Sequence, residues 1–259
     1  MFNHVILPLN LMFCHYIFEF LEKRGRIKYN ETKTGMVPVP THALKNEYII
    51  VCKDGFMSYG GNQVWSENAV IRKCGCGVIS SLDLLLYLGR YHCGGQAQEV
   101  RPIPLNEYDR MCIELSRRYL PLLPPFGTNG AALALGLNRV FARYNMPYRA
   151  SWQLSGSKIM AKVENMLDAD IPVILSVGAN FPFVWQENRV TLYSRDSLGK
   201  MHRASSAKAH YVTVTGSELN YLRISSWGRE YYINKGEYFS YIKQHSSSII
   251  SNILMVERR

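Results

Sequence analysis

One stretch decides the expected fold, residues 74–89, which reads CGCGVISSLDLLLYLG. From Cys76 onward its apolar residues repeat at three- and four-residue spacing, the pattern of a helix with a buried face. Glycines at positions 75 and 77 leave the Cys76 side chain open and let the chain turn tightly before the helix. The stretch therefore predicts a buried helix over residues 76–89 with a cysteine in its first turn.

Three more helices are predicted between this one and residue 170. The first spans residues 106–119 and is stopped by the proline-rich segment 120–125. The second starts near Asn129 and carries apolar residues at helical spacing as far as Phe141. The third is a short helix that ends at Leu167, for which Ser157 is the expected N-cap because serine is favoured at that position.

Beyond Pro172 the pattern changes from helices to strands. Short apolar or alternating runs, separated by turn signals, predict strands at residues 172–177, 189–193, 211–215, 222–224 and 231–233. The first 70 residues are irregular, with a β-branched run at residues 48–51. Helices followed by antiparallel strands indicate an α+β fold with an active site between the two halves. We expect one domain, 1–259, made of an N-terminal extension or strands (1–60), a helical half (61–170) and a β-sheet half (171–259).

Composition and charge narrow the class of protein. Of the 259 residues, 47% are hydrophobic and 19% are charged, which excludes a disordered or collagen-like chain. The net charge is +10, but after a basic run at residues 23–33 the Lys and Arg residues are scattered. Without a zinc-finger or RNA-binding signature, this charge predicts a solvated basic surface. It favours an acidic partner weakly, and no nucleic-acid partner is expected.

The N-terminus does not have the pattern of a secretion signal. Residues 1–20 are apolar, but their basic cluster follows them instead of preceding them. Asn10, His15 and Glu19 interrupt the apolar run, and no later segment is long enough for a membrane span. We therefore expect a protein with no membrane span, in the cytoplasm and with reduced thiols, although secretion is left open.

The six cysteines are too few for a disulfide scaffold. Apolar neighbours predict core positions for three of them, Cys14, Cys52 and Cys112. A metal site would have to join Cys74, Cys76, His92 and Cys93, whose separations lack the short ligand spacings of structural zinc sites. We expect no metal and no cofactor.

Cys76 and His210 have the attributes of a nucleophile and its base. Unpaired N–H groups and the helix dipole at a helix N-terminus favour the thiolate, which is the reactive form of cysteine. His210 begins a predicted strand 134 residues downstream of Cys76. Ser225 follows on the next strand, where a hairpin would bring it beside the imidazole as the group that orients the ring.

These motifs resemble the papain-like cysteine peptidase superfamily. The resemblance rests on four segments: Cys-Gly-Val-Ile-Ser-Ser-Leu at 76–82, Pro-Val-Ile at 172–174, His-Tyr-Val-Thr-Val-Thr-Gly at 210–216 and Ser-Trp-Gly at 226–228. They are most similar to the bacterial double-glycine, or bacteriocin-leader, peptidases and their free-standing relatives. The separation of Cys76 and His210 also lies within the roughly 130–150 residues typical of papain-type enzymes.

The resemblance implies a papain-like fold and a thiol hydrolase, a cysteine peptidase or amidase, that acts on a peptide or amide through an acyl-thioenzyme. Cys76 would attack the acyl carbon and His210 would shuttle the proton. Ser225 stands where the family usually has Asn or Asp to orient the histidine. For the oxyanion donor, which relatives place upstream of the cysteine, Gln63 is the best candidate and Asn68 is the rival.

Two other functions use the same fold. An acyltransferase would pass the acyl group to an amine instead of water, and its Cys–His chemistry is identical. A catalytically inactive module would keep the cleft for binding only, and Ser225 in place of Asn or Asp is its main support.

Overall fold

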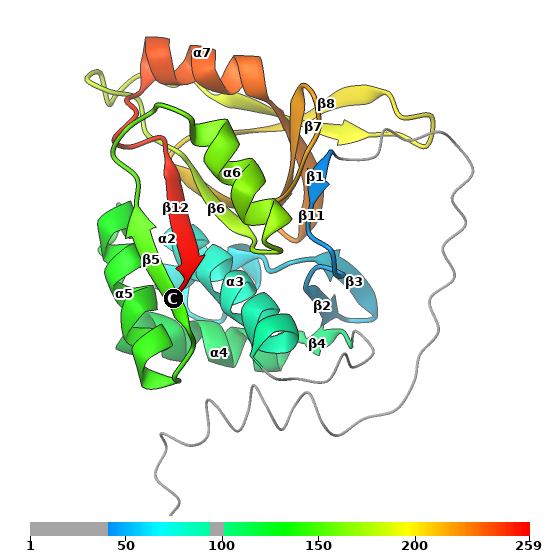
Figure 1. Ribbon diagram of the computed structural model, residues 1–259, viewed down its shortest axis with the longest axis vertical. Coiled ribbons are helices and arrows are strands. Elements are labelled where there is room, and N and C mark those ends of the chain that lie inside the picture. Colours follow the sequence, from blue (N-terminus) through cyan, green and yellow to red (C-terminus); the bar gives the residue numbers. More distant parts are fainter. Residues whose placement is uncertain (1–40, 94–100) are drawn as a thin grey trace, which may run out of the picture.

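A large antiparallel sheet runs through the protein. The computed structural model describes residues 41–93 and 101–259 (Figure 1). In this part of the chain nine strands form the sheet, in the order β5-β12-β6-β9-β10-β11-β7-β8, with β1 paired to the end of β9. Their bounds are β1 (His42–Ala43), β5 (Tyr148–Trp152), β6 (Val173–Val177), β7 (Val190–Arg195), β8 (Met201–Ala207), β9 (His210–Ser217), β10 (Tyr221–Ser226), β11 (Arg229–Asn234) and β12 (Ile253–Arg258).

The middle of this sheet is buried on both faces because helices cover it. All residues of β6 are buried, and so are those of β9 except Tyr211. Figure 1 shows α6 (Ile159–Asp168) and α7 (Lys235–His245) above the sheet and α3 (Cys76–His92) below it, with α4 (Leu105–Arg118) packed against α3. A strand with both faces covered often reads as a nearly continuous apolar run, as β6 does, whereas β9 was recognisable by its alternating valines and threonines.

The helix α3 lies inside the protein. Every residue from Gly77 to Arg90 is buried, and α3 packs against β9, β6, α4 and α5 (Gly130–Arg143). A helix that is apolar around most of its circumference is expected in such an interior position. The central placement of α3 fixes its first residue, Cys76, at the edge of the sheet where β9 begins.

A smaller sheet lies beside α3 and α4. It has the order β3-β2-β4, from β2 (Ile50–Lys53), β3 (Phe56–Tyr59) and β4 (Ile103–Pro104). After β3 the chain continues through a short loop into the 3-10 helix η1 (Gln63–Trp65) and then into α2 (Ala69–Cys74). This sheet therefore leads the chain up to the N-terminus of α3.

The expected combination of helices and a large antiparallel sheet is confirmed. The helices predicted at 76–89, at 106–119 and from near Asn129 correspond to α3, α4 and α5, and Asn129 is indeed an N-cap that accepts from the Ala132 N–H at 2.9 Å. Ser157 is not the N-cap of α6. The chain turns one residue later, at Lys158 in the left-handed region (φ 58°), and the Ser157 hydroxyl hydrogen-bonds Ser155 instead.

Several expectations have other outcomes. Cys112 is buried, as expected, but Cys52 on β2 is only partly buried. Cys14, the apolar stretch at residues 1–20 and the basic run at 23–33 lie outside the described residues. Among the helices that are described, none is both long and apolar enough to cross a membrane.

Candidate active site

Cys76 is the first residue of α3, at a tight junction between two helices. Gly75 is both the C-cap of α2 and the N-cap of α3, and the Gly75 N–H donates to the Ile71 carbonyl at 2.8 Å. Burial raises the pKa of the Cys76 thiol, and hydrogen bonds from the backbone of Tyr211 and Gly77 act in the opposite direction. The thiol therefore lies against the start of β9, beside the residue that follows His210.

The neighbouring cysteine has a different environment. Cys74 is the last residue of α2, is buried, and donates its thiol hydrogen to the Val70 carbonyl at 3.3 Å. This bond directs the Cys74 sulfur back along its own helix. Of the two thiols, only that of Cys76 belongs to the lining of the pocket described next.

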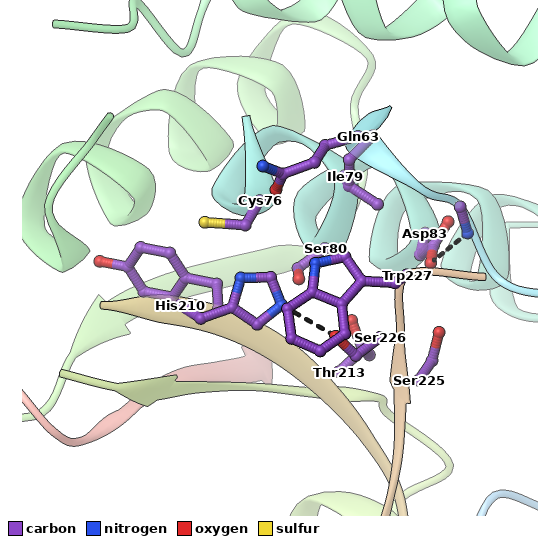
Figure 2. Close-up of a pocket in the computed structure, with 12 residues that line it drawn as sticks. Gln63, Cys76, Ile79, Ser80, Asp83, His210, Thr213, Ser225, Ser226 and Trp227 are labelled. Carbon is purple, nitrogen blue, oxygen red and sulfur yellow. Dashed lines mark hydrogen bonds between the residues drawn. The ribbon is translucent and has the colours of Figure 1, made fainter. Parts of the chain in front are cut away.

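Cys76 and His210 line one small, narrow pocket with room for about one water molecule. Figure 2 shows the His210 ring below Cys76, with Nε2 turned away toward Ser226 and the other ring nitrogen, Nδ1, on the cysteine side. Within the described residues no hydrogen bond joins the Cys76 sulfur to the imidazole. Catalytic hydrogen bonds are often long without substrate and tighten in the complex, so this arrangement is compatible with a working Cys–His pair.

Two neighbours fix the orientation of the His210 ring. Its Nε2 lies 2.8 Å from the Ser226 hydroxyl oxygen, and its face stacks on the Trp227 indole with ring centroids 4.5 Å apart. The side chain is nearly enclosed, and this burial lowers the pKa of His210 to about 4. The imidazole is therefore neutral at physiological pH and able to accept a proton.

The structure places Ser226, not Ser225, at the position of the orienting group. Ser225 pairs with Thr213 across the sheet, and its hydroxyl donates to the Tyr59 carbonyl at 2.7 Å. Successive side chains of a strand point to opposite faces of the sheet. The expected position was wrong by one residue, so Ser226 instead of Ser225 faces the imidazole. The same alternation puts Ser226 on the face of His210, diagonal to it across the strand pair, within side-chain reach.

Gln63 and Asn68 are separated by their hydrogen bonds. The Gln63 side chain reaches into the pocket beside Cys76 (Figure 2), and its amide nitrogen donates one hydrogen to the Arg72 carbonyl at 3.1 Å. An amide nitrogen carries two hydrogens, so a second donor hydrogen remains. The Gln63 amide oxygen is buried and has no hydrogen-bond partner within the described residues. Asn68 is instead the N-cap of α2, where its side-chain oxygen accepts from the N–H groups of Val70 and Ile71.

The backbone is strained on both sides of the imidazole. Ala209, just before His210, and Trp227, which stacks on the ring, both have left-handed φ angles, 51° and 50°. Such angles cost a non-glycine residue on the order of 1–3 kcal/mol and cluster at functional sites. Trp227 is retained there by its contacts with the ring of His210 and, edge-on, with Tyr231.

The alternative metal cluster is divided between the two ends of α3. His92 is 16 residues beyond Cys76, about 24 Å along the helix. Its ring nitrogens hydrogen-bond the Tyr148 hydroxyl at 2.8 Å and the Asp170 carboxylate at 3.0 Å. No group of three metal-ligating side chains occurs in residues 41–93 and 101–259.

Comparison of the chain with family models, curated proteins and solved structures finds no match. Its function is therefore inferred from the pocket of Cys76 and His210. Of the residues that line this pocket, the sequence indicated Cys76, His210, Gln63 and Ser225. It did not indicate the contact that Ser226 makes with His210, or the buried Asp83. The alternation of side chains along β10 was the signal that could have identified Ser226.

Proposed function

We propose that this protein is a papain-like thiol hydrolase, a cysteine peptidase or amidase that works through an acyl-thioenzyme. The observation that carries the proposal is the shared pocket: a helix N-terminus presents Cys76, and a strand start presents a neutral imidazole whose Nδ1 is on the cysteine side. Nucleophilic catalysis by a thiol requires a nucleophile, a base within its reach and a group that orients the base. Cys76, His210 and the Ser226 hydroxyl would supply these three groups.

In the first step the Cys76 sulfur bonds to the carbonyl carbon of a peptide or amide. The thiol proton passes to His210 Nδ1, and the electron pair of the C=O double bond moves to the oxygen. The Cys76 backbone N–H has no partner within its helix, because it belongs to the first turn of α3. Together with the Gln63 amide it supplies donors for this oxyanion.

In the second step the intermediate collapses and the carbon–nitrogen bond breaks. The leaving amine takes the proton from His210 Nδ1, and the acyl group remains on Cys76 as a thioester. A water molecule then attacks the thioester, gives its proton to His210 and releases the acid, and the thiol regains its hydrogen. Throughout both steps Nε2 keeps its hydrogen and donates it to Ser226.

Burial determines the resting protonation state of the pair. It raises the pKa of Cys76 and lowers the pKa of His210 to about 4, so at neutral pH the thiol and the imidazole are both uncharged. His210 then acts as a general base that takes the thiol proton during attack, and the nucleophile is not a preformed thiolate. General base catalysis of this kind contributes about 10²–10⁴-fold to rate.

The test uses p-nitrophenyl acetate, an activated ester that acylates nucleophilic thiols and releases a coloured product. We expect acetylation of Cys76, located by mass spectrometry, and a loss of at least about 100-fold in its rate for His210→Ala. The matched control is His202→Ala, since His202 is an exposed residue that pairs with Asp196 far from this pocket's lining. It should retain the rate of the unmodified protein.

The same measurement separates the alternatives. A catalytically inactive module is favoured by the missing Cys76–His210 hydrogen bond and the uncharged pair, and it predicts slow acetylation that His210→Ala leaves unchanged. That result would contradict the proposal. An acetyl-enzyme that persists in water and is released only by an added amine would indicate an acyltransferase.

A further inference from the structure

Asp83 is a buried carboxylate two turns along the helix that begins with Cys76. It is 1% exposed and contributes to the lining of the same pocket. Three donors converge on it: the Tyr108 hydroxyl at 2.6 Å, the Tyr48 hydroxyl at 3.0 Å and the backbone N–H of Gly61 at 3.2 Å. The third of these contacts ties α3 to the loop that leads to Gln63.

Two glycines allow this loop to approach the carboxylate. A Cβ atom at Gly60 would lie 2.6 Å from the Asp83 carboxylate and 2.3 Å from the Ser225 hydroxyl. A Cβ atom at Gly61 would lie 2.1 Å from the Tyr108 hydroxyl. A side chain at either position would push these hydroxyl and carboxylate groups aside, so Gly60 and Gly61 favour the close contact with Asp83.

The same loop is fastened to the histidine side of the pocket. The Gly61 carbonyl accepts from the Gly228 N–H at 2.9 Å, and the Asn62 side chain donates to the Trp227 carbonyl at 3.1 Å. Gln63 follows directly, as the first residue of η1. The loop is thus held between the helix that carries Cys76 and the turn that carries Trp227, and Gln63 has little freedom to move relative to either.

We propose that Asp83 is a positioning residue for the oxyanion donor, holding the Gly60–Gly61 loop so that the Gln63 amide lies beside Cys76. This inference rests on the proposed thiol hydrolase function. Its physical basis is that an oxyanion donor stabilises the transition state only when it is fixed in place before the reaction. Asp83 provides that fixation through the backbone, because it bonds Gly61, two residues before Gln63.

A carboxylate suits this position better than an amide. All three of its partners donate hydrogens, and an ionised carboxylate is a pure acceptor with two oxygens. Burial raises the pKa of Asp83 to about 6, while the bonds from Tyr108, Gly61 and Tyr48 oppose that rise, so the carboxylate remains ionised at neutral pH. Well-packed apolar residues often stabilise a core as much as a buried charge does, so core stability alone does not account for a carboxylate at position 83. The loop that Asp83 holds does account for it.

The test compares two reactions of the same thiol. Acylation of Cys76 by p-nitrophenyl acetate passes through a tetrahedral oxyanion, whereas alkylation by iodoacetamide is a direct displacement that forms none. The ratio of the two rates therefore measures oxyanion stabilisation separately from the reactivity of the thiol. For Gln63→Ala we expect this ratio to fall by about 100-fold, the usual effect of removing one oxyanion donor.

For Asp83→Ala we expect the ratio to fall by at least about 10-fold, with alkylation within about twofold of the unmodified protein. Asp83→Asn fills the same space and keeps an oxygen for Gly61, so it should recover much of the ratio. Asp83→Leu fills the same space without an acceptor, so it should lower the ratio as Asp83→Ala does, and it serves as the decisive variant if Asp83→Ala does not fold. Adding Asp83→Ala to Gln63→Ala should lower the ratio no further, because both act on one donor. The matched control is Asp109→Ala, a buried carboxylate that accepts from the Glu67 N–H at 2.8 Å instead of from a residue of the 60–63 loop.

The outcomes distinguish this inference from the proposed function. If Gln63→Ala lowers the ratio but the variants without an acceptor, Asp83→Ala and Asp83→Leu, keep it, the function stands and the positioning role is wrong. If Asp83→Ala slows alkylation as much as acylation, Asp83 is a structural residue only, and the inference is again wrong. If the unmodified protein is not acylated at Cys76 at all, both proposals fail.

Discussion

Two adjacent serines on β10 have different roles because they face opposite sides of the sheet. The Ser226 hydroxyl is the partner of His210 Nε2, whereas the Ser225 hydroxyl donates to the Tyr59 carbonyl. The Ser226 hydroxyl makes one hydrogen bond to the imidazole, and it holds the ring less firmly than an amide or carboxylate oxygen would. Stacking on Trp227 supplies the remaining constraint on the ring.

This difference predicts unequal effects of removing each hydroxyl. Ser226→Ala should slow iodoacetamide alkylation of Cys76 by about fivefold, since one hydrogen bond contributes about 1 kcal/mol to holding the base. Ser225→Ala should leave alkylation unchanged, because its contact is with the backbone of β3. Rates measured on the two purified variants check this, and an equal loss in Ser225→Ala would show that the assignment of the two serines is wrong.

Among the elements, α2 is the short helix that sets the start of α3. Asn68 caps it, with its oxygen accepting from the N–H groups of Val70 and Ile71 at 2.9 and 3.2 Å. These hydrogen bonds hold the Asn68 side chain at the N-terminus of α2. Cys76 follows the other end of that helix. The structure therefore gives Asn68 a capping role, and Gln63 remains the oxyanion donor of the proposed function.

Asn68→Ala should lower the free energy of unfolding by about 1 kcal/mol, the usual cost of losing an N-cap. The ratio of acylation to alkylation at Cys76 should not change. Denaturant unfolding and the two labelling rates measure these effects, and Asn129→Ala is the matched control because Asn129 caps α5 in the same way. A fall in the ratio for Asn68→Ala alone would restore Asn68 as a candidate oxyanion donor.

At the scale of the whole molecule, Asp170 joins segments that are distant in sequence. Its carboxylate accepts from the Lys45 N–H and the Asn46 amide before β2, and from Tyr87 and His92 on α3. Burial raises the pKa of Asp170, but these hydrogen bonds outweigh it and lower the value to about 2. The folded protein thus holds this carboxylate in its charged form more strongly than the unfolded chain does.

The lowered pKa predicts how stability depends on pH. The contribution of Asp170 is fully present above the unfolded pKa of about 4 and is lost as the pH falls through about 2, and it is worth about 2 kcal/mol. Asp170→Asn should therefore lower the unfolding free energy by about 2 kcal/mol near neutral pH and by much less near pH 2.

Denaturant titrations at several pH values provide the measurement. Asp168→Asn is the matched control, because Asp168 bonds His42 with its side chain more than half exposed, and exposed pairs contribute little. A difference between Asp170→Asn and the unmodified protein that stays constant from pH 7 to about pH 2 would contradict the assigned pKa.

Local patterns were sufficient for part of the fold. The helix α3 and the strands β6 and β9 were predicted because their apolar spacing is strong and they are buried on both sides. The strands β5 and β12 and the helices α2 and α7 were not predicted. β5 and β12 are stabilised by pairing with each other across about 100 residues of chain, an interaction that no local pattern contains.

By itself, the sequence indicated the candidate pair on which the proposed function rests: a cysteine opening a buried helix and a histidine opening a buried strand. Only the tertiary structure decided which groups support that pair. Ser226 replaces Ser225 because the register of β9 with β10 fixes which side chains share a face. Asp83 reaches the Gln63 loop because two glycines let separate segments touch. Nucleophile and base are marked by local chemistry, whereas their supporting contacts join residues that become neighbours only when the chain folds.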